Sequence, residues 1–90
     1  MQTMLQIQPD ISKNKRVTKK SDALIVRLLA ERIRSLRMKK GLSQEDFAER
    51  AMLHRNYIGK IERAEINPTI VVVHQIAAAL DMDLPSFIDF

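Results

Sequence analysis

The chain has 90 residues, the size of one small domain, and it has no Cys, which excludes disulfides, thiolate metal sites and Cys nucleophiles. Its two Gly, three Pro, one Tyr and three Phe, among abundant Leu, Ile, Val, Ala, Arg, Lys and Glu, favour a helical domain over a sheet. The net charge of +4 is divided into +8 over residues 1–40 and −4 over residues 41–90, which predicts contact with a polyanion, either nucleic acid or a membrane surface.

Residues 1–20 show no helical or strand periodicity, and residues 13–20 include five Lys and Arg. The first residues lack the basic and long apolar regions of a secretory signal. The most apolar run, from Ile70 to Leu80, falls short of the roughly 20 residues that span a bilayer. We therefore expect a soluble, cytoplasmic protein in which residues 1–21 form a flexible basic arm before a domain at residues 22–90. The arm either contacts the polyanion or is simply solvated.

A first helix is expected to begin near Ala23 and to end at Gly41. Ser21 or Asp22 would cap its start, because their short side-chain oxygens accept the free N–H groups of a first turn. Gly41 would end it by adopting the left-handed conformation. Four apolar residues recur at spacings of three and four, which defines one helical stripe: Ile25, Leu29, Ile33 and Leu36.

Two short helices are expected next, one from Gln44 to near Ala51 and one from Arg55 onward. Ser43 is placed to cap the first of them, with Asp46 at the position of a capping-box acid. The apolar positions that must face a shared core are Phe47, Ala48, Ala51, Leu53, Ile58 and Ile61.

The segment Asn67-Pro68-Thr69 interrupts this pattern, and Thr69 is expected to cap a fourth helix. Three consecutive Val at 71–73 favour a strand locally, but the run is short and the Ala-rich segment after it is helical. Asp83 is expected to cap a last turn or two, with Pro85 tolerated in the first turn. The expected core positions of the fourth helix are Ile70, Val73, Ile76, Ala77 and Leu80.

Two short helices joined by a tight turn form a helix-turn-helix. With Ile58 facing the core, the opposite side of the later helix and its flanks present Arg55, Asn56, Tyr57, Lys60 and Arg63. These side chains supply hydrogen-bond donors for base edges and phosphates, on a rod that fits the major groove of DNA. Double-stranded DNA is therefore the favoured partner.

Residues 29–90 carry a set of linked motifs: LAERIRSLR at 29–37, GLSQ at 41–44, Phe47-Ala48, Tyr57-Ile58, IER at 61–63 and NPT at 67–69. In sequence and spacing these resemble the phage-repressor type of helix-turn-helix protein, the Cro/repressor or XRE family. The resemblance implies an all-α, lambda-repressor-like bundle of five helices that binds operator DNA, usually as a homodimer. It also implies an ion pair between Arg37 and Glu62, which join the first and third helices.

The candidate DNA-contact residues are Gln44, His54, Arg55, Asn56, Tyr57, Lys60 and Arg63. The resemblance implies that Gln44 contacts phosphate and that His54, Arg55, Asn56 and Lys60 contact phosphate or bases. Arg55 offers two donors to guanine O6 and N7, with phosphate or solvent as the alternative. Asn56 either pairs with adenine or bonds to nearby backbone. Tyr57 either contacts a thymine methyl or sugar or packs in the seam beside Ile61.

Four residues depart from the family pattern. Met52, Ala64 and Asp81 replace Gly at helix-ending turns. Met52 either adopts a positive φ, at a cost of roughly 1 kcal/mol or more, or the turn takes a different shape. Gly59, in contrast, lies inside the third helix, where it weakens that helix by roughly 1 kcal/mol relative to Ala. Gly59 either lets the backbone approach DNA or reflects drift at a solvent position.

An apolar patch of Val71, Val72, Phe87, Ile88 and Phe90 is expected either to form a dimer interface or to pack on the domain's own core. Two-fold pairing would set two recognition helices ~34 Å apart and predict a near-palindromic operator. No metal, cofactor or catalytic site is expected, since His54 and His74 lie on different helices without a carboxylate at ligand spacing.

The sequence therefore predicts a sequence-specific transcriptional regulator, a repressor or dual regulator, and not an enzyme. Without a sensor domain, control by protein concentration is expected, as in a restriction–modification controller protein or a compact phage-type repressor. One alternative is an antitoxin that mainly binds a partner toxin and autoregulates its operon. Another, a membrane-surface binder, is disfavoured by the buried-type apolar pattern on every helix.

Overall fold

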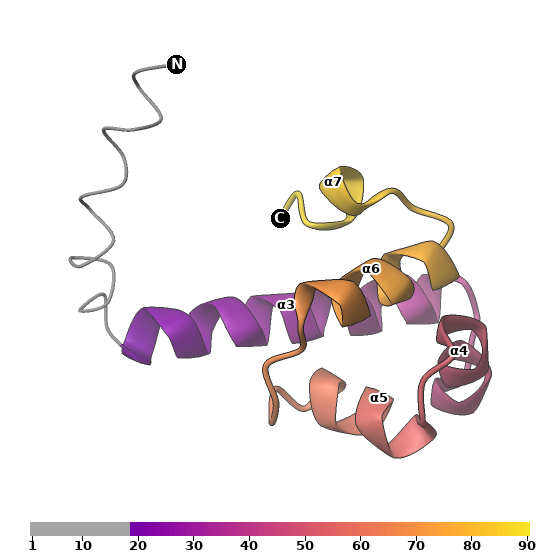
Figure 1. The fold of residues 1–90 in the computed structure, drawn as a ribbon, viewed down its shortest axis with the longest axis horizontal. Coiled ribbons are helices and arrows are strands. Elements are labelled where there is room, and N and C mark those ends of the chain that lie inside the picture. The colour runs from indigo at the N-terminus through magenta and orange to yellow at the C-terminus, as the bar shows by residue number, and fades with distance from the viewer. Residues whose placement is uncertain (1–18) are drawn as a thin grey trace.

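The computed structural model describes residues 19–90, with side chains from Asp22 onward, and all regular elements in this range are helices. They are α3 (Lys19–Lys39), α4 (Gln44–Ala51), α5 (Arg55–Glu62), α6 (Ile70–Ala79) and α7 (Leu84–Phe87). Figure 1 shows α4 and α5 below the long α3, with α6 across it and α7 above. The expected all-α bundle of five helices is confirmed. Over this range no helix has the length and apolarity to cross a bilayer.

The start of α3 differs from the expectation. The helix begins at Lys19, four residues before Ala23, so Ser21 and Asp22 lie inside it and do not precede it. Residues 19–22 contain neither Pro nor Gly, and nothing in them stops the helix from extending toward the N-terminus. The expected arm lies outside the described residues except for residues 19–21, and it stays a prediction.

The turns and caps follow local chemistry. The Ser43 hydroxyl accepts a hydrogen bond from the Asp46 N–H at 3.0 Å, and the Thr69 hydroxyl accepts one from the Val72 N–H at 3.2 Å. Asp83 takes the N-cap position of α7 without a side-chain bond. The expectation at the Gly-replaced turns is confirmed, because the backbone has a φ of 60° at each of Met52, Ala64 and Asp81.

The core lies where α3, α4, α5 and α6 meet, and α7 closes one end. Its largest fully buried side chains are Phe47, Phe87, Ile33, Ile58, Ile61 and Ile76. The expected core positions Val73, Ile76, Ala77 and Leu80 are confirmed, but Ile70 is wrong, because 63% of it is exposed. Ile70 starts α6 one turn before Val73, where no described element covers the helix.

The expected apolar patch is divided between its two alternatives, because Phe87 and Val72 pack on the domain's own core while Val71, Ile88 and Phe90 remain exposed. Phe87 is fully buried, and Val72 is half-buried against the core. Arg32 on α3 helps to keep Phe87 buried. Its Nε donates to the Phe87 carbonyl and its Nη2 donates to the Ser86 carbonyl, both at 3.0 Å. These bonds satisfy carbonyls at the end of α7 and hold that helix against α3.

Candidate nucleic-acid interface

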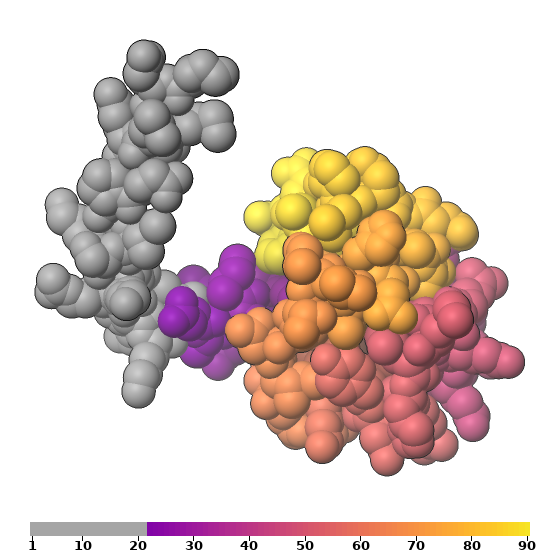
Figure 2. Space-filling view, viewed as in Figure 1, coloured from indigo at the N-terminus to yellow at the C-terminus, as the bar shows by residue number. Residues whose placement is uncertain are grey.

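The turn between α4 and α5 sets the orientation of the recognition helix. Met52 ends α4 in the left-handed conformation, and the next N–H, that of Leu53, donates to the Ala48 carbonyl at 2.9 Å. Ala48 is small and buried where the helices meet, and Phe47 and Ile58 are fully buried beside it. Because these apolar residues take the inner side, the polar side of α5 faces out. Figure 2 shows the α4 and α5 segments as adjoining parts of one surface.

Five of the seven candidate residues gather around one cavity on this surface, called the hollow below. The cavity has a volume of about 250 Å³ and is lined by Gln44, Arg55, Asn56, Gly59, Lys60 and Arg63. Asn56, Lys60 and Arg63 are exposed, as expected for the outer side of α5. The structure therefore joins the start of α4 to the outer face of α5 in one donor-rich hollow.

The two other candidates lie outside the hollow. His54 is the N-cap of α5, and its Nδ1 accepts a hydrogen bond from the Asn56 N–H at 3.0 Å. His54 thus makes the local cap bond that was considered for Asn56. Tyr57 is half-buried and packs against the core, which agrees with its place in the seam.

A buried carboxylate ties Gln44 to the bundle. Glu62 Oε2 accepts from Arg37 Nε at 2.7 Å, and Glu62 Oε1 accepts from Arg37 Nη2 at 3.1 Å. The expected pair between α3 and α5 is therefore present. The same Oε1 also accepts from Gln44 Nε2 at 3.0 Å, a contact that the sequence did not predict. One amide hydrogen of Gln44 is thereby used to fix its side chain, and the second remains for a ligand.

Two exposed acids lie beside the candidate cations. Glu65 accepts from Arg63 Nε at 2.8 Å and from Arg63 Nη2 at 3.3 Å, whereas Glu45 lies 3.9 Å from Arg55. The hydrogen bond from Arg63 is the main cause that lowers the pKa of Glu65, and the same bond raises the pKa of Arg63. Sequence reasoning missed Glu65, although its position directly after Ala64, which replaces a helix-ending Gly of the family, was a usable signal.

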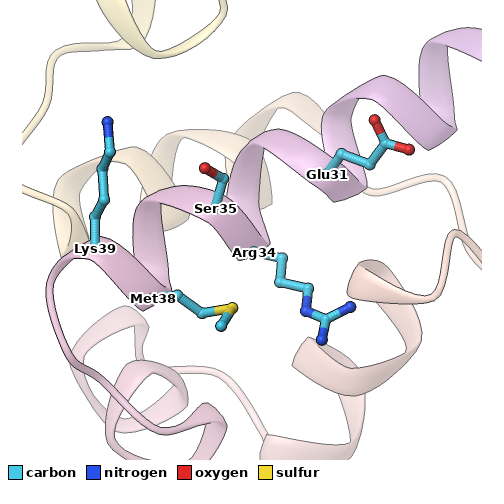
Figure 3. Close-up of a pocket in the computed structure, with 5 residues that line it drawn as sticks. All are labelled: Glu31, Arg34, Ser35, Met38 and Lys39. Carbon is cyan, nitrogen blue, oxygen red and sulfur yellow. The ribbon is translucent and has the colours of Figure 1, made fainter.

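The remaining hollows have a different character. Figure 3 shows one along α3 whose labelled side chains, Glu31, Arg34, Ser35, Met38 and Lys39, point in different directions and converge on no centre. Across residues 19–90, no three His, Cys, Asp or Glu residues group as metal ligands.

A second hollow, of about 480 Å³, is an apolar groove between the first half of α3 and the two ends of the α6–α7 segment. It is lined by Ile25, Val26, Leu29, Asn67, Pro68, Ile70, Val73, Ile88 and Phe90. Ile25, Ile70, Ile88 and Phe90 remain about half exposed or more within it.

The sequence matches known regulators. The helix-turn-helix family model HTH_3 matches residues 33–87. Control protein C.SmaI of Serratia marcescens is 44% identical over 64 residues, which are 71% of this chain and 76% of that protein. The HTH-type transcriptional regulator SinR of Bacillus subtilis is 32% identical over 63 residues, and the match spans 69% of this chain and 57% of SinR.

A solved structure agrees. The restriction-modification controller protein C.AhdI from Aeromonas hydrophila superposes with a TM-score of 0.66 at 37% identity, over 69% of this chain and 94% of C.AhdI. These relatives are regulators or control proteins, and none of them supports the antitoxin alternative. The chain therefore belongs to the helix-turn-helix family of the Cro/repressor (XRE) type, and it is a DNA-binding transcriptional regulator.

Proposed function

We propose that this regulator binds a near-palindromic operator as a homodimer and controls transcription through its own concentration, as a restriction–modification controller. The single observation that carries the DNA-binding part is the hollow on α4 and α5, whose lining side chains are polar or cationic and lie outside the core. The control function is supported by the likeness to C.SmaI and C.AhdI, which are both control proteins. Such a protein acts where its operator lies, in the cytoplasm.

The position of each side chain suggests its part in binding. Arg55 begins α5 and is proposed to donate to O6 and N7 of guanine, while Asn56 beside it has both a donor and an acceptor for adenine. Gln44 and Lys60 also line the hollow, and they are proposed to contact phosphate. His54 uses Nδ1 as an acceptor, so in the neutral ring the proton is on Nε2, which is free to donate to a phosphate.

The dimer interface is proposed along the apolar groove. Ile25, Ile70, Val71, Ile88 and Phe90 are each about half exposed or more, and they come from α3, α6 and the C-terminal residues. A domain this small buries little of its own apolar surface, so covering this groove with a second copy would stabilise both. Two-fold pairing would set the two α5 helices about one DNA turn apart, ~34 Å.

The test is selection of bound duplexes from a random-sequence pool, carried out with the wild-type chain and with Arg55→Ala. The matched control is Arg34→Ala, which removes an exposed Arg from α3 and not from α5. We expect the wild type and the control to enrich the same near-palindrome, and Arg55→Ala to lose preference at one base pair in each half-site. Enrichment of no sequence by the wild type would reject the proposal.

The basic arm is proposed to add phosphate contacts. Residues 13–18 lie outside the described structure, and the proposal rests on their charge alone. Each phosphate neutralised contributes about 0.9 to the slope of log affinity against log salt. Removal of residues 1–18 should therefore reduce the slope measured with the selected duplex. An unchanged slope would show that the arm is only solvated.

A further inference from the structure

The end of α5 is built so that the chain turns back on itself. Ala64, with a φ of 60°, donates its N–H to the Ile61 carbonyl at 3.0 Å, and the Glu65 N–H donates to the Lys60 carbonyl at 2.9 Å. These two bonds are the pattern that ends a helix with a left-handed residue. Because Glu65 is returned against the last turn of α5, its carboxylate lies beside the side chain of Arg63.

The contact between Glu65 and Arg63 uses one edge of the guanidinium. The carboxylate accepts from Nε and from Nη2, at 2.8 Å and 3.3 Å. A guanidinium carries five N–H donors, so three remain, two on Nη1 and one on Nη2. A pair of donors on adjacent nitrogens matches the O6 and N7 acceptors of guanine in the major groove.

The absence of a side chain at Gly59 leaves room for the Arg63 guanidinium. The glycine is buried although it belongs to an exposed part of α5, and a Cβ added there would lie 3.0 Å from Arg63 Nη1. The Arg63 side chain therefore lies across the bare backbone of Gly59. A glycine inside a helix costs roughly 1 kcal/mol relative to alanine, so its presence here calls for a reason beyond folding.

Arg63 also shares its surface with the proposed DNA contacts. It lines the same hollow as Asn56 and Lys60, which precede it in α5 by seven and three residues and so lie on one side of the helix. An arginine folded back on its helix and held at one edge keeps fewer rotamers than a free surface arginine. Less conformational entropy is then lost when it binds.

We propose that Glu65 is a positioning residue, which holds the Arg63 guanidinium over Gly59 so that its free edge reads a guanine in the operator. This inference rests on the proposed DNA-binding function and deepens it. The three residues would act together in reading one base. Gly59 leaves space for the guanidinium, Arg63 contacts the guanine, and Glu65 orients the Arg63 side chain.

The experiment compares binding to a duplex selected by the wild type with binding to single-base-pair variants of that duplex. Arg63→Ala should reduce discrimination at one base pair of each half-site about tenfold, within the range of a bidentate contact. Glu65→Gln should lose discrimination at that same base pair, and the double variant should lose no more than Arg63→Ala alone. Arg63→Lys keeps the charge without the fork, so it should keep affinity for scrambled DNA but not the discrimination.

Two further variants separate orientation from charge and from folding. Glu49→Gln on α4 makes the same change of charge at another exposed acid, so it should leave discrimination at every base pair unchanged. Gly59→Ala should displace Arg63 and lower discrimination, while the higher helix propensity of Ala keeps or raises the thermal midpoint. A purely structural role of Gly59 would not give this opposite pair of effects.

The outcomes are distinct. If the wild type selects an operator but Glu65→Gln discriminates at every base pair as the wild type does, the positioning role is wrong and the proposed function stands. The same holds if Glu65→Gln only strengthens binding to all duplexes, which would make Glu65 a competitor of phosphate. If the wild type selects no sequence, both proposals fail.

Discussion

The guanidinium of Arg37 on α3 and the carboxylate of Glu62 on α5 form a two-bond ion pair that is almost closed to solvent. Only 11% of the Arg37 side chain and 3% of the Glu62 side chain are exposed. Arg37 Nη1 also donates to the Leu42 carbonyl at 2.7 Å, and Gln44 donates to Glu62. One pair thus joins the first helix, the loop before α4 and the recognition helix, and it sets where α5 lies relative to α3.

Loss of Glu62 should destabilise the fold. Glu62→Ala leaves Arg37 without a counter-charge at a site with little water, and we expect the free energy of unfolding to fall by about 3 kcal/mol. Urea denaturation of the two proteins measures this. Glu45→Ala is the control, because its pair with Arg55 is long and exposed and should be worth less than about 0.5 kcal/mol. Equal effects of the two substitutions would contradict the assignment.

Glycine at the turn between α4 and α5 should stabilise the protein. Met52 has a φ of 60° and is 83% exposed, so Met52→Gly removes backbone strain and little packing. We expect the free energy of unfolding to rise by about 0.5–1 kcal/mol, since the entropy of the unfolded Gly offsets part of the gain. Met38→Gly, at an exposed position within α3, should instead destabilise by up to about 1 kcal/mol. Destabilisation by both would refute the strain argument.

The cap of the recognition helix should depend on an acceptor at residue 54. His54→Ala removes the bond from Nδ1 to the Asn56 N–H, and stability should fall by about 1 kcal/mol in thermal or urea unfolding. His54→Asn supplies another side-chain acceptor and should restore most of the loss. If Asn and Ala at this position give the same stability, the cap bond contributes nothing.

The proposed dimer should separate when charge enters the groove region. Val71 is exposed on α6, so Val71→Glu should leave the fold intact while it shifts sedimentation from dimer to monomer at micromolar concentration. Met38→Glu is the matched control, because it places the same charge at an exposed apolar residue on α3 that is not part of the proposed interface. Dimerisation that survives Val71→Glu would place the interface elsewhere.

The contact between Glu65 and Arg63 should be visible in a titration without DNA. The pKa of the Glu65 carboxyl is lowered in the folded state, mainly by the hydrogen bond from Arg63. The pair therefore stabilises the folded state fully above the unfolded-state pKa of Glu65. This stabilisation is lost as the pH falls through the lower, folded-state pKa. NMR titration of the Glu65 carboxyl should show a midpoint below that of an ordinary Glu, and Arg63→Ala should raise that midpoint, because the hydrogen bond from Arg63 is the largest cause of the lowered pKa. The same midpoint in both proteins would show that the contact does not form.

The features that could be predicted from the sequence are those that depend on interactions between residues close together in the chain. The caps at Ser43 and Thr69 and the outward side of α5 follow from local hydrogen bonds and a helical period, whereas the positive φ at Met52 was expected from the family pattern. The linked motifs added the Arg37–Glu62 pair through family resemblance. For this reason the order of the helices and the exposure of Asn56, Lys60 and Arg63 were predictable before any coordinates.

Only the tertiary structure decided which apolar residues at helix ends are covered. Phe87 and Ile88 are neighbours in the chain, yet the first is fully buried and the second is exposed, because Arg32 holds α7 against α3 across 55 positions of sequence. The contact of the Arg63 side chain with Gly59 likewise could not be predicted, because it depends on the course of the chain after α5. Periodicity marks the side of a helix that is apolar, whereas burial depends on whether a distant element reaches that side.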